Sequence, residues 1–151
     1  MSFSTRTTEV GVIAGPEHGL QRLIVQVQPV APDKVGHIHR HDSADQILCV
    51  LQGEVLIEVD GQSMVCGPGE MGVAPAGSPH GFLGLGAPAL LEVFGEQGGG
   101  TVFLLANDEE IEVHRPGVPW DRHGPPTDMA ALAPRLLAPC WRSPGANDPN
   151  I

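Results

Sequence analysis

Histidines are concentrated in one short stretch of the chain, and their spacing indicates metal chemistry. The stretch 36–54 reads GHIHRHDSADQILCVLQGE and contains His37, His39 and His41, three of the seven histidines. In an extended strand, side chains two residues apart point to the same face, so these imidazoles share a face. Such a strand offers a metal two imidazoles from one short segment. The remaining ligands must come from neighbouring strands that face the same cavity.

Two other side chains are candidates for completing such a site. Gln46 opens the apolar run 46–52, and its side-chain oxygen has lone pairs that a cation can accept. His80 lies in the stretch PAGSPHG, where Pro75 and Gly77 mark a corner that would turn its imidazole into the same cavity. We take His39, His41, Gln46 and His80 as candidate metal ligands. His37 is either a further ligand, a base or proton carrier at the rim, or an exposed side chain.

The elements that must position these side chains are short strands. Apolar runs alternate with Gly (20) and Pro (15), and there is no long helical periodicity. We expect eight or more strands in an antiparallel sandwich or barrel. A hairpin with an Asp60-Gly61 turn is predicted within 54–67. The other strands are predicted within 20–30, 37–41, 46–52, 71–86, 89–96 and 101–106.

The sequence also predicts which side chains on these strands are buried and which face solvent. In 20–30, a half-buried strand, Leu23, Val25 and Val27 face one way, and Gln26 and Gln28 face the other. The carboxylates Glu92 and Glu96 are expected to face solvent. Plain core residues are expected at Leu48, Val50, Met64, Met71, Phe82, Leu91 and Phe94. Buried structural thiols are expected at Cys49, Cys66 and Cys140, since their odd number and spacing suit neither a disulfide framework nor a zinc knuckle.

Charge and hydropathy exclude several classes of protein. The formal net charge of −10 argues against a nucleic-acid partner, which would require a basic surface. No apolar stretch is long enough to span a bilayer, and the N-terminus lacks the apolar core of a signal peptide. We therefore expect a cytoplasmic protein with a small-molecule substrate.

The composition changes near the end of the predicted strands. From Asn107 the chain is acidic and rich in proline, so we expect a barrel domain over 1–110 and an extension over 111–151 that packs on the barrel or on a partner subunit. One short helix is predicted over 129–138, interrupted by Pro134. His18, His114 and His123 are expected to have ordinary roles. Trp120 and Trp141 are expected to cover a barrel end or a subunit contact.

The candidate ligands fall on a known motif. The first motif of the cupin superfamily is G-x5-H-x-H-x3,4-E-x6-G, and His39, His41 and Gly53 match it, with Gln46 in place of the glutamate. Asp33 stands where the leading glycine would be. The second motif, G-x5-P-x-G-x2-H-x3-N, is matched from Gly69 to His80, with glycine at 84 in place of the asparagine. The chain therefore resembles small single-domain microbial cupins over roughly residues 20 to 106.

This resemblance implies a fold, a ligand set and a metal. The fold would be an all-β, double-stranded β-helix (jelly-roll) barrel with an irregular, partly helical C-terminal tail. A divalent metal at its mouth would be held by His39, His41, Gln46 and His80, or by His37 in place of Gln46. Without a carboxylate, the metal keeps its full charge and would attract an anionic substrate strongly. Zn²⁺ is favoured, and Fe²⁺, Ni²⁺ or Mn²⁺ are alternatives.

Three functions are compatible with these observations. The first is an enzyme that uses the metal as a Lewis acid on an enolisable carbonyl, because the chain resembles the cupin-type aromatic polyketide cyclases in its size and its carboxylate-free histidine site. The second is a non-haem Fe(II) dioxygenase that cleaves a β-diketone-like or aromatic substrate. The third is a small-ligand-binding cupin without catalytic activity. By family analogy we expect a homodimer.

Overall fold

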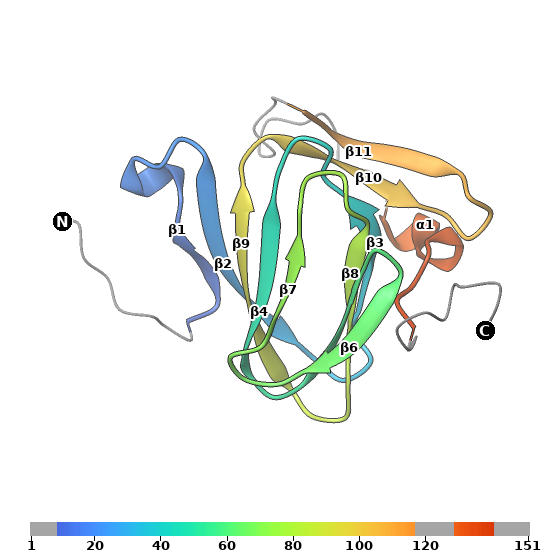
Figure 1. Cartoon of the computed structure of the whole chain (residues 1–151), viewed down its shortest axis with the longest axis horizontal. Helices are drawn as coiled ribbons and strands as arrows, with labels where there is room; N and C mark the ends of the chain where they lie inside the picture. Colours follow the sequence, from blue (N-terminus) through green and yellow to red (C-terminus); the bar gives the residue numbers. More distant parts are fainter. Residues whose placement is uncertain (1–8, 117–128, 141–151) are drawn as a thin grey trace.

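Two antiparallel sheets form a barrel in the computed structural model (Figure 1), which describes residues 9–116 and 129–140. One sheet has the strand order β1-β2-β9-β4-β7, and the other has the order β11-β10-β3-β8-β5-β6. The strands are β1 (Gly11–Ala14), β2 (Leu23–Val30), β3 (Val35–Arg40), β4 (Gln46–Gln52), β5 (Val55–Val59), β6 (Gln62–Cys66), β7 (Met71–Ala74), β8 (His80–Gly84), β9 (Ala89–Glu96), β10 (Gly99–Leu104) and β11 (Glu110–Pro116). The expected double-stranded β-helix fold is confirmed.

The turns follow the local chemistry of the sequence. Asp60 and Gly61 have φ angles of 51° and 77°, and they join β5 to β6 in a two-residue hairpin. Two successive residues with positive φ match the right-handed twist of the flanking strands, which is why an Asp-Gly pair is favoured there. The β7 and β8 strands flank the Pro/Gly corner at 75–79, as predicted.

The interior of the barrel is apolar over much of its length. The buried cluster draws on both sheets, since β4 and β9 face β5 and β8 across the barrel. Its members are Val30, Leu48, Val50, Val55, Ile57, Cys66, Phe82, Ala89, Leu91 and Val93. Each Val, Leu, Ile or Phe side chain of this cluster, once buried, contributes about 1.5–3 kcal/mol relative to leaving it exposed. Inward positions near the other end of the same strands carry polar residues instead.

Several burial predictions were wrong. Met64 and Met71 are 47% and 48% exposed, because β6 and β7 are edge strands with only one paired neighbour each. Glu92 is only 2% exposed, since it lies on β9 in the middle of its sheet, between buried Val27 and Cys49. On β2 it is Gln26 that lines a cavity, on the side opposite to Val27.

The described residues that follow β10 pack on the second sheet. Strand β11, which the sequence pattern did not predict, pairs with β10, and His114 lies in it. Helix α1 (Met129–Leu132) and the 3₁₀ turn η3 (Ala133–Arg135) lie within the helix predicted over 129–138, with Pro134 inside η3. Leu137 accepts a hydrogen bond from the backbone of Ile38 in β3. Cys140 is exposed, in contrast to the buried Cys49 and Cys66.

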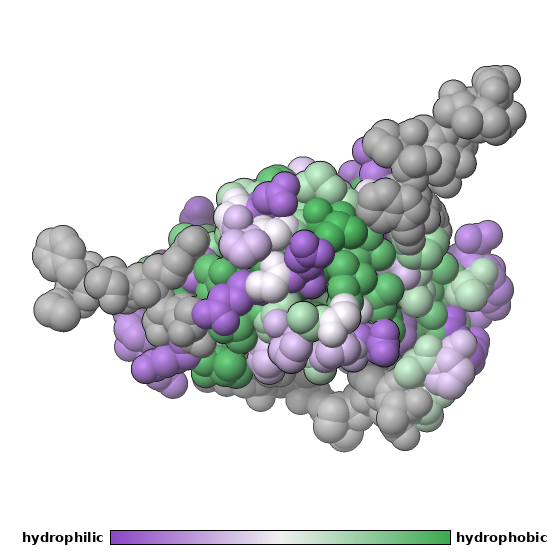
Figure 2. Space-filling model, turned by 90° about the horizontal axis from the view of Figure 1, so that it is seen from below, coloured by the Kyte–Doolittle hydropathy of each residue, from purple (hydrophilic) through white to green (hydrophobic). Residues whose placement is uncertain are grey.

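The predictions for Trp120, His123 and Trp141 concern residues that lie outside the described part of the chain. The helices within 9–116 and 129–140 are too short to cross a membrane. Figure 2 views the molecule from below Figure 1, at the end of the barrel where β9 begins. On this surface, apolar residues lie between hydrophilic ones.

Candidate metal centre

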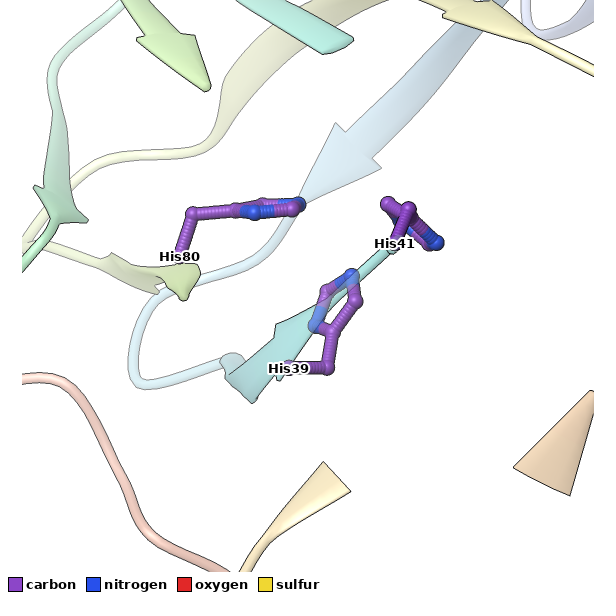
Figure 3. A group of neighbouring side chains, drawn as sticks. All are labelled: His39, His41 and His80. Carbon is purple, nitrogen blue, oxygen red and sulfur yellow. The ribbon is translucent and has the colours of Figure 1, made fainter. Parts of the chain in front are cut away.

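Three histidines from two neighbouring strands meet at one end of the barrel (Figure 3). His39 lies in β3, His41 follows its last residue, and His80 opens β8. Because β3 pairs with β8 so that His39 is opposite His80, the three side chains reach one point. One nitrogen of each ring lies within 4.8 Å of those of the other two. The predicted grouping of His39, His41 and His80 is therefore present.

Each of the three rings is oriented by a backbone carbonyl. The Nδ1 atoms lie 2.8, 2.7 and 2.9 Å from the carbonyl oxygens of His37, Gly100 and Ser78, for His39, His41 and His80 respectively. A carbonyl oxygen only accepts hydrogen bonds, so each Nδ1 carries the proton and donates it. In a neutral imidazole, Nε2 is then left with a lone pair. This arrangement fixes the tautomer and the ring direction, as is usual for histidines that bind metals.

The Nε2 atoms of His41 and His80 meet no hydrogen-bond donor among the described residues as they are placed. Within the described part of the chain, Nε2 of His41 is buried and has no hydrogen-bond partner. Nε2 of His80 lies 2.6 Å from Oε1 of Gln46. With Nδ1 of His80 protonated, both of these atoms are acceptors and repel one another unless the amide turns its NH₂ group inward. A divalent cation bound by both atoms would remove this repulsion, so the donor set fits a metal ion.

Burial keeps the rings of His39 and His80 neutral. Burial, and then the neighbouring His80, lowers the pKa of His39 to about 3. Burial lowers the pKa of His80 to about 4, although its hydrogen bond to Ser78 opposes the shift. Neutral imidazole is the form that binds a metal. The site is thus prepared for a cation at neutral pH.

Comparisons with known proteins agree with this geometry. A family model described as a cupin domain matches residues 26–94. The chain belongs to the cupin superfamily. TT1209 from Thermus thermophilus is 32% identical to this cupin, over 50% of this chain and 72% of that chain, with a TM-score of 0.48. The comparison with curated proteins finds no match.

Two further solved structures resemble this cupin. KdgF from Halomonas sp. is 27% identical over 56% of this chain and 74% of that chain, with a TM-score of 0.52. The polyketide cyclase RemF from Streptomyces resistomycificus is 25% identical over 60% of this chain and 70% of that chain, with a TM-score of 0.49. A dioxygenase and a sugar phosphate isomerase, both 22% identical, share the fold. Proteins of this fold therefore carry out different reactions, and the fold alone does not select one.

In this cupin, His37 is not part of the histidine group. The ligand atoms that lie within 4.8 Å of one another belong to the other three histidines. The pairing of β3 with β8 is irregular between Gly36 and His39, which interrupts the regular alternation of side chains there. The His37 side chain is partly buried, and burial lowers its pKa. Its backbone carbonyl orients His39.

A cavity of about 220 Å³ adjoins His41, and the sequence did not reveal it. It is lined by His41, Gln46, the ends of β2 and β9, and the glycine-rich turn at 98–100 that leads into β10. Glu96 is partly buried in its wall, although it was expected to face solvent. The run GEQGGGT was the available signal, because three successive glycines leave a wall without side chains. This run lies against Asp45 and Gln46 only once the barrel has closed, so the sequence alone does not show that contact.

Proposed function

We propose that this cupin is a metal-dependent enzyme whose neutral histidine/glutamine site acts as a Lewis acid on an enolisable carbonyl compound. One observation carries the proposal. The Nδ1–H groups of His39, His41 and His80 are all taken by backbone carbonyls, so their Nε2 lone pairs are left for a shared cation. We assign these three residues and Gln46 as ligands of one divalent metal, with Zn²⁺ favoured. Imidazole also suits Fe²⁺ and Ni²⁺.

The charge of the ligand set supports an enolisable substrate. Three imidazoles and one amide add no negative charge, so a divalent cation would keep its full charge. When bound, this cation would supply the positive charge that stabilises the oxygen anion of an enolised carbonyl. Within the protein, the backbone carbonyls hold the imidazoles in place, and burial excludes water from His80, which is 1% exposed.

His37 is our proposed proton carrier. It lies two residues before His39 on the same strand and is partly buried. Because burial lowers its pKa, the ring is neutral at neutral pH and can accept a proton from the substrate. His37→Gln should therefore lower the rate of proton exchange from a β-diketone by about 10²–10⁴-fold while the metal content is unchanged. Loss of metal in this variant would instead make His37 a ligand.

Aldol-type closure of a compact polyketone followed by loss of water is our finer proposal. The reaction begins with the same enolisation, and a β-diketone could approach the site with both oxygens. The cavity of about 220 Å³ is smaller than the ~300–1,000 Å³ typical of drug-sized ligands. A small polyketone, or one end of a larger one, matches this volume.

The test combines elemental analysis of the purified protein with an activity assay in the presence and in the absence of oxygen. Protein purified without added metal should contain zinc, and it should exchange the α-protons of a β-diketone at the same rate with and without air. Iron together with oxygen uptake on a β-diketone would replace our proposal with the dioxygenase alternative. Absence of any bound metal, with none taken up on addition, would leave only a ligand-binding role.

We also propose a homodimer formed through the outer face of the five-stranded sheet. Cross-strand neighbours give this face an apolar row consisting of Val25, Phe94, Ile47 and Val73. The adjacent residues Ile24, Val93 and Gln46 line the cavity, so the row points outward, and Val73 is 56% exposed. Light scattering should report a dimer for the native chain and a monomer for Val73→Lys. A monomeric native chain would disprove this proposal.

A further inference from the structure

We propose that the cavity beside Gln46 selects a compact substrate whose end against Asp45 and Glu96 is uncharged or cationic. Gly95 would set the size limit, and Asp45 and Glu96 would set the charge. This inference rests on the proposed function, because it takes the enolisable carbonyl as the end of the substrate that lies at the metal ligands. The electrostatic character of the cavity wall itself is a property of the chain and does not depend on a metal.

Gly95 keeps space open next to Gln46. These two residues are cross-strand partners in β9 and β4, and both line the cavity. A Cβ atom at position 95 would lie 3.5 Å from Nε2 of Gln46 and 4.0 Å from Cγ2 of Ile24. Both distances are ordinary van der Waals contacts, so the fold would accept a methyl group there. The methyl group would occupy space that a ligand beside Gln46 needs.

Two carboxylates belong to the same wall. Glu96 accepts a hydrogen bond from the backbone of Asp45 at 2.7 Å, and Asp45 accepts one from the backbone of Ala76 at 2.8 Å. The first bond holds the end of β9 against the loop between β3 and β4, and the second holds that loop against the corner between β7 and β8. Both residues line the cavity together with His41, whose buried Nε2 faces no donor among the described residues.

Among the described residues, no positive charge compensates these carboxylates. The described residues that line the cavity include no lysine or arginine. The ion pairs of the described residues join Arg40 to Asp42 and Glu110, and Arg135 to Glu109, and none of them involves Asp45 or Glu96. A carboxylate or phosphate at this end of a substrate would therefore meet two like charges. An ammonium group would be attracted, and a hydroxyl or amide would be tolerated.

The two groups of side chains thus have opposite preferences. The histidines and Gln46 are neutral and would attract an enolate once a cation is bound. The wall at Asp45 and Glu96 repels anions with or without a metal. A substrate with an enolisable carbonyl at one end and a neutral or cationic group at the other would enter in one orientation. A dicarboxylate would be excluded.

The test uses three acetoacetamides that share a head and differ in the charge of the tail. The probes are N-(2-aminoethyl)-, N-(2-hydroxyethyl)- and N-(carboxymethyl)acetoacetamide, and their dissociation constants are measured at neutral pH with zinc-loaded and with metal-free protein. We expect the cationic probe to bind tightest and the anionic probe weakest, with about tenfold between neighbours. In the double variant Asp45→Asn/Glu96→Gln, the three constants should agree within about twofold. Both substitutions keep the oxygen that accepts the backbone hydrogen bond.

Glu70→Gln is the matched control. Glu70 also accepts a backbone hydrogen bond, from Gly67 at 2.9 Å, but it lies next to the other end of β4, where its carbonyl accepts from Val50. This variant should keep the native order of affinities. Equal affinities in the native protein, or an order that survives in the double variant, would overturn the inference, as would failure of all three probes to bind either form. If zinc does not bind, the proposed function fails, and the order measured on metal-free protein still decides the inference.

A second pair of variants tests the size limit. Gly95→Ala should weaken binding of N-(2-hydroxyethyl)acetoacetamide by about fivefold or more while the melting temperature stays close to native. Gly86→Ala is the control, because a Cβ atom there meets no atom within 4 Å. It should leave the affinity unchanged. Native affinity in Gly95→Ala would show that the space beside Gln46 is not used by the probe.

Discussion

The same strands build two different halves of the barrel. In β4, Gln46 lies beside the histidines, while Leu48 and Val50 belong to the apolar cluster. In β9, Gly95 lines the cavity, while Leu91 is fully buried in the cluster. Inward positions two residues apart on one strand therefore serve different purposes. One half is packed with apolar side chains, and the other presents polar lone pairs and open space.

Strand β8 shows the reason for this division most directly. His80 and Phe82 are both buried, at 1% and 8% exposure, and are two residues apart. Phe82 needs only apolar neighbours, whereas His80 presents a lone pair that no donor in the described chain clearly satisfies. Burying such a group carries a cost unless a partner is bound. Stability should thus reside in the packed half, and ligand binding in the histidine half, so that changes in the two halves have separable effects.

Acid should act on the histidine half and produce the largest effect. The folded-state pKa values of His39 and His80 are lowered to about 3 and about 4, below the ordinary value of 6.5. As pH falls below about 6.5, the unfolded chain takes up protons first, so the free energy of unfolding decreases until the folded-state values are reached. The decrease is at most about 1.4 kcal/mol per pH unit for each ring, or several kcal/mol in total. Urea denaturation of metal-free protein between pH 4.5 and 7.5 measures it.

Two variants sharpen this result. His80→Gln removes one of the two titrating rings, so the stability of this variant should depend less on pH in the acid range. Met64→Ala, at a 47% exposed position on β6, removes no histidine and should leave the acid dependence as in the native protein. If His80→Gln loses stability with acid as steeply as the native chain, the buried rings are not the source of the sensitivity.

A cavity in the packed half should have the next largest effect, and it should spare the site. Leu91 is 0% exposed, so Leu91→Ala should lower the free energy of unfolding by about 2–5 kcal/mol. The zinc affinity of the folded fraction should change by less than about twofold. Denaturation and metal titration of the same sample measure both quantities. Val10→Ala, at a 61% exposed position, should cost less than about 0.5 kcal/mol. Equal losses of stability and of zinc affinity in Leu91→Ala would mean that the halves are coupled.

The two halves also differ in how far the sequence predicts them. The packed half follows from alternation and turn chemistry, so β4, β9 and the Asp60-Gly61 hairpin were predictable. The spacing of His39, His41 and His80 also predicted their meeting, because it is fixed by pairing of two short strands. Burial of Glu92 and exposure of Met64 were not predictable, since they depend on which strands lie at sheet edges.

The cavity could not be predicted from the sequence for a related reason. Its wall joins Asp45 to the segment 96–101, about fifty positions later in the chain. Local pattern gives no information on which loops meet when a barrel closes. The irregular register between Gly36 and His39, which separates His37 from the other rings, is likewise set by pairing between β3 and β8.

Removal of a ligand should affect the histidine half alone. His80→Ala should weaken zinc binding by about 100-fold or more, because one of three converging imidazoles is lost. Gln46→Ala should weaken it by about tenfold, as expected for a weaker neutral donor. Competition with a chromogenic chelator measures both constants. Equal losses of zinc affinity in the two variants would show that Gln46 is a full ligand. Unchanged zinc affinity in His80→Ala would refute the site.

Gln46→Glu should produce the smallest change and would separate the two contributions of this position. A carboxylate at the same place adds an anionic donor, so zinc should bind about tenfold more tightly. The same charge lowers the net positive charge of the loaded site, so an enolisable β-diketone should bind several-fold more weakly at the same zinc occupancy. Zinc titration and diketone titration of one preparation give both numbers. Tighter zinc with unchanged diketone affinity would mean that neutrality of the ligand set does not attract the substrate, and that the histidine half is tuned for the metal alone.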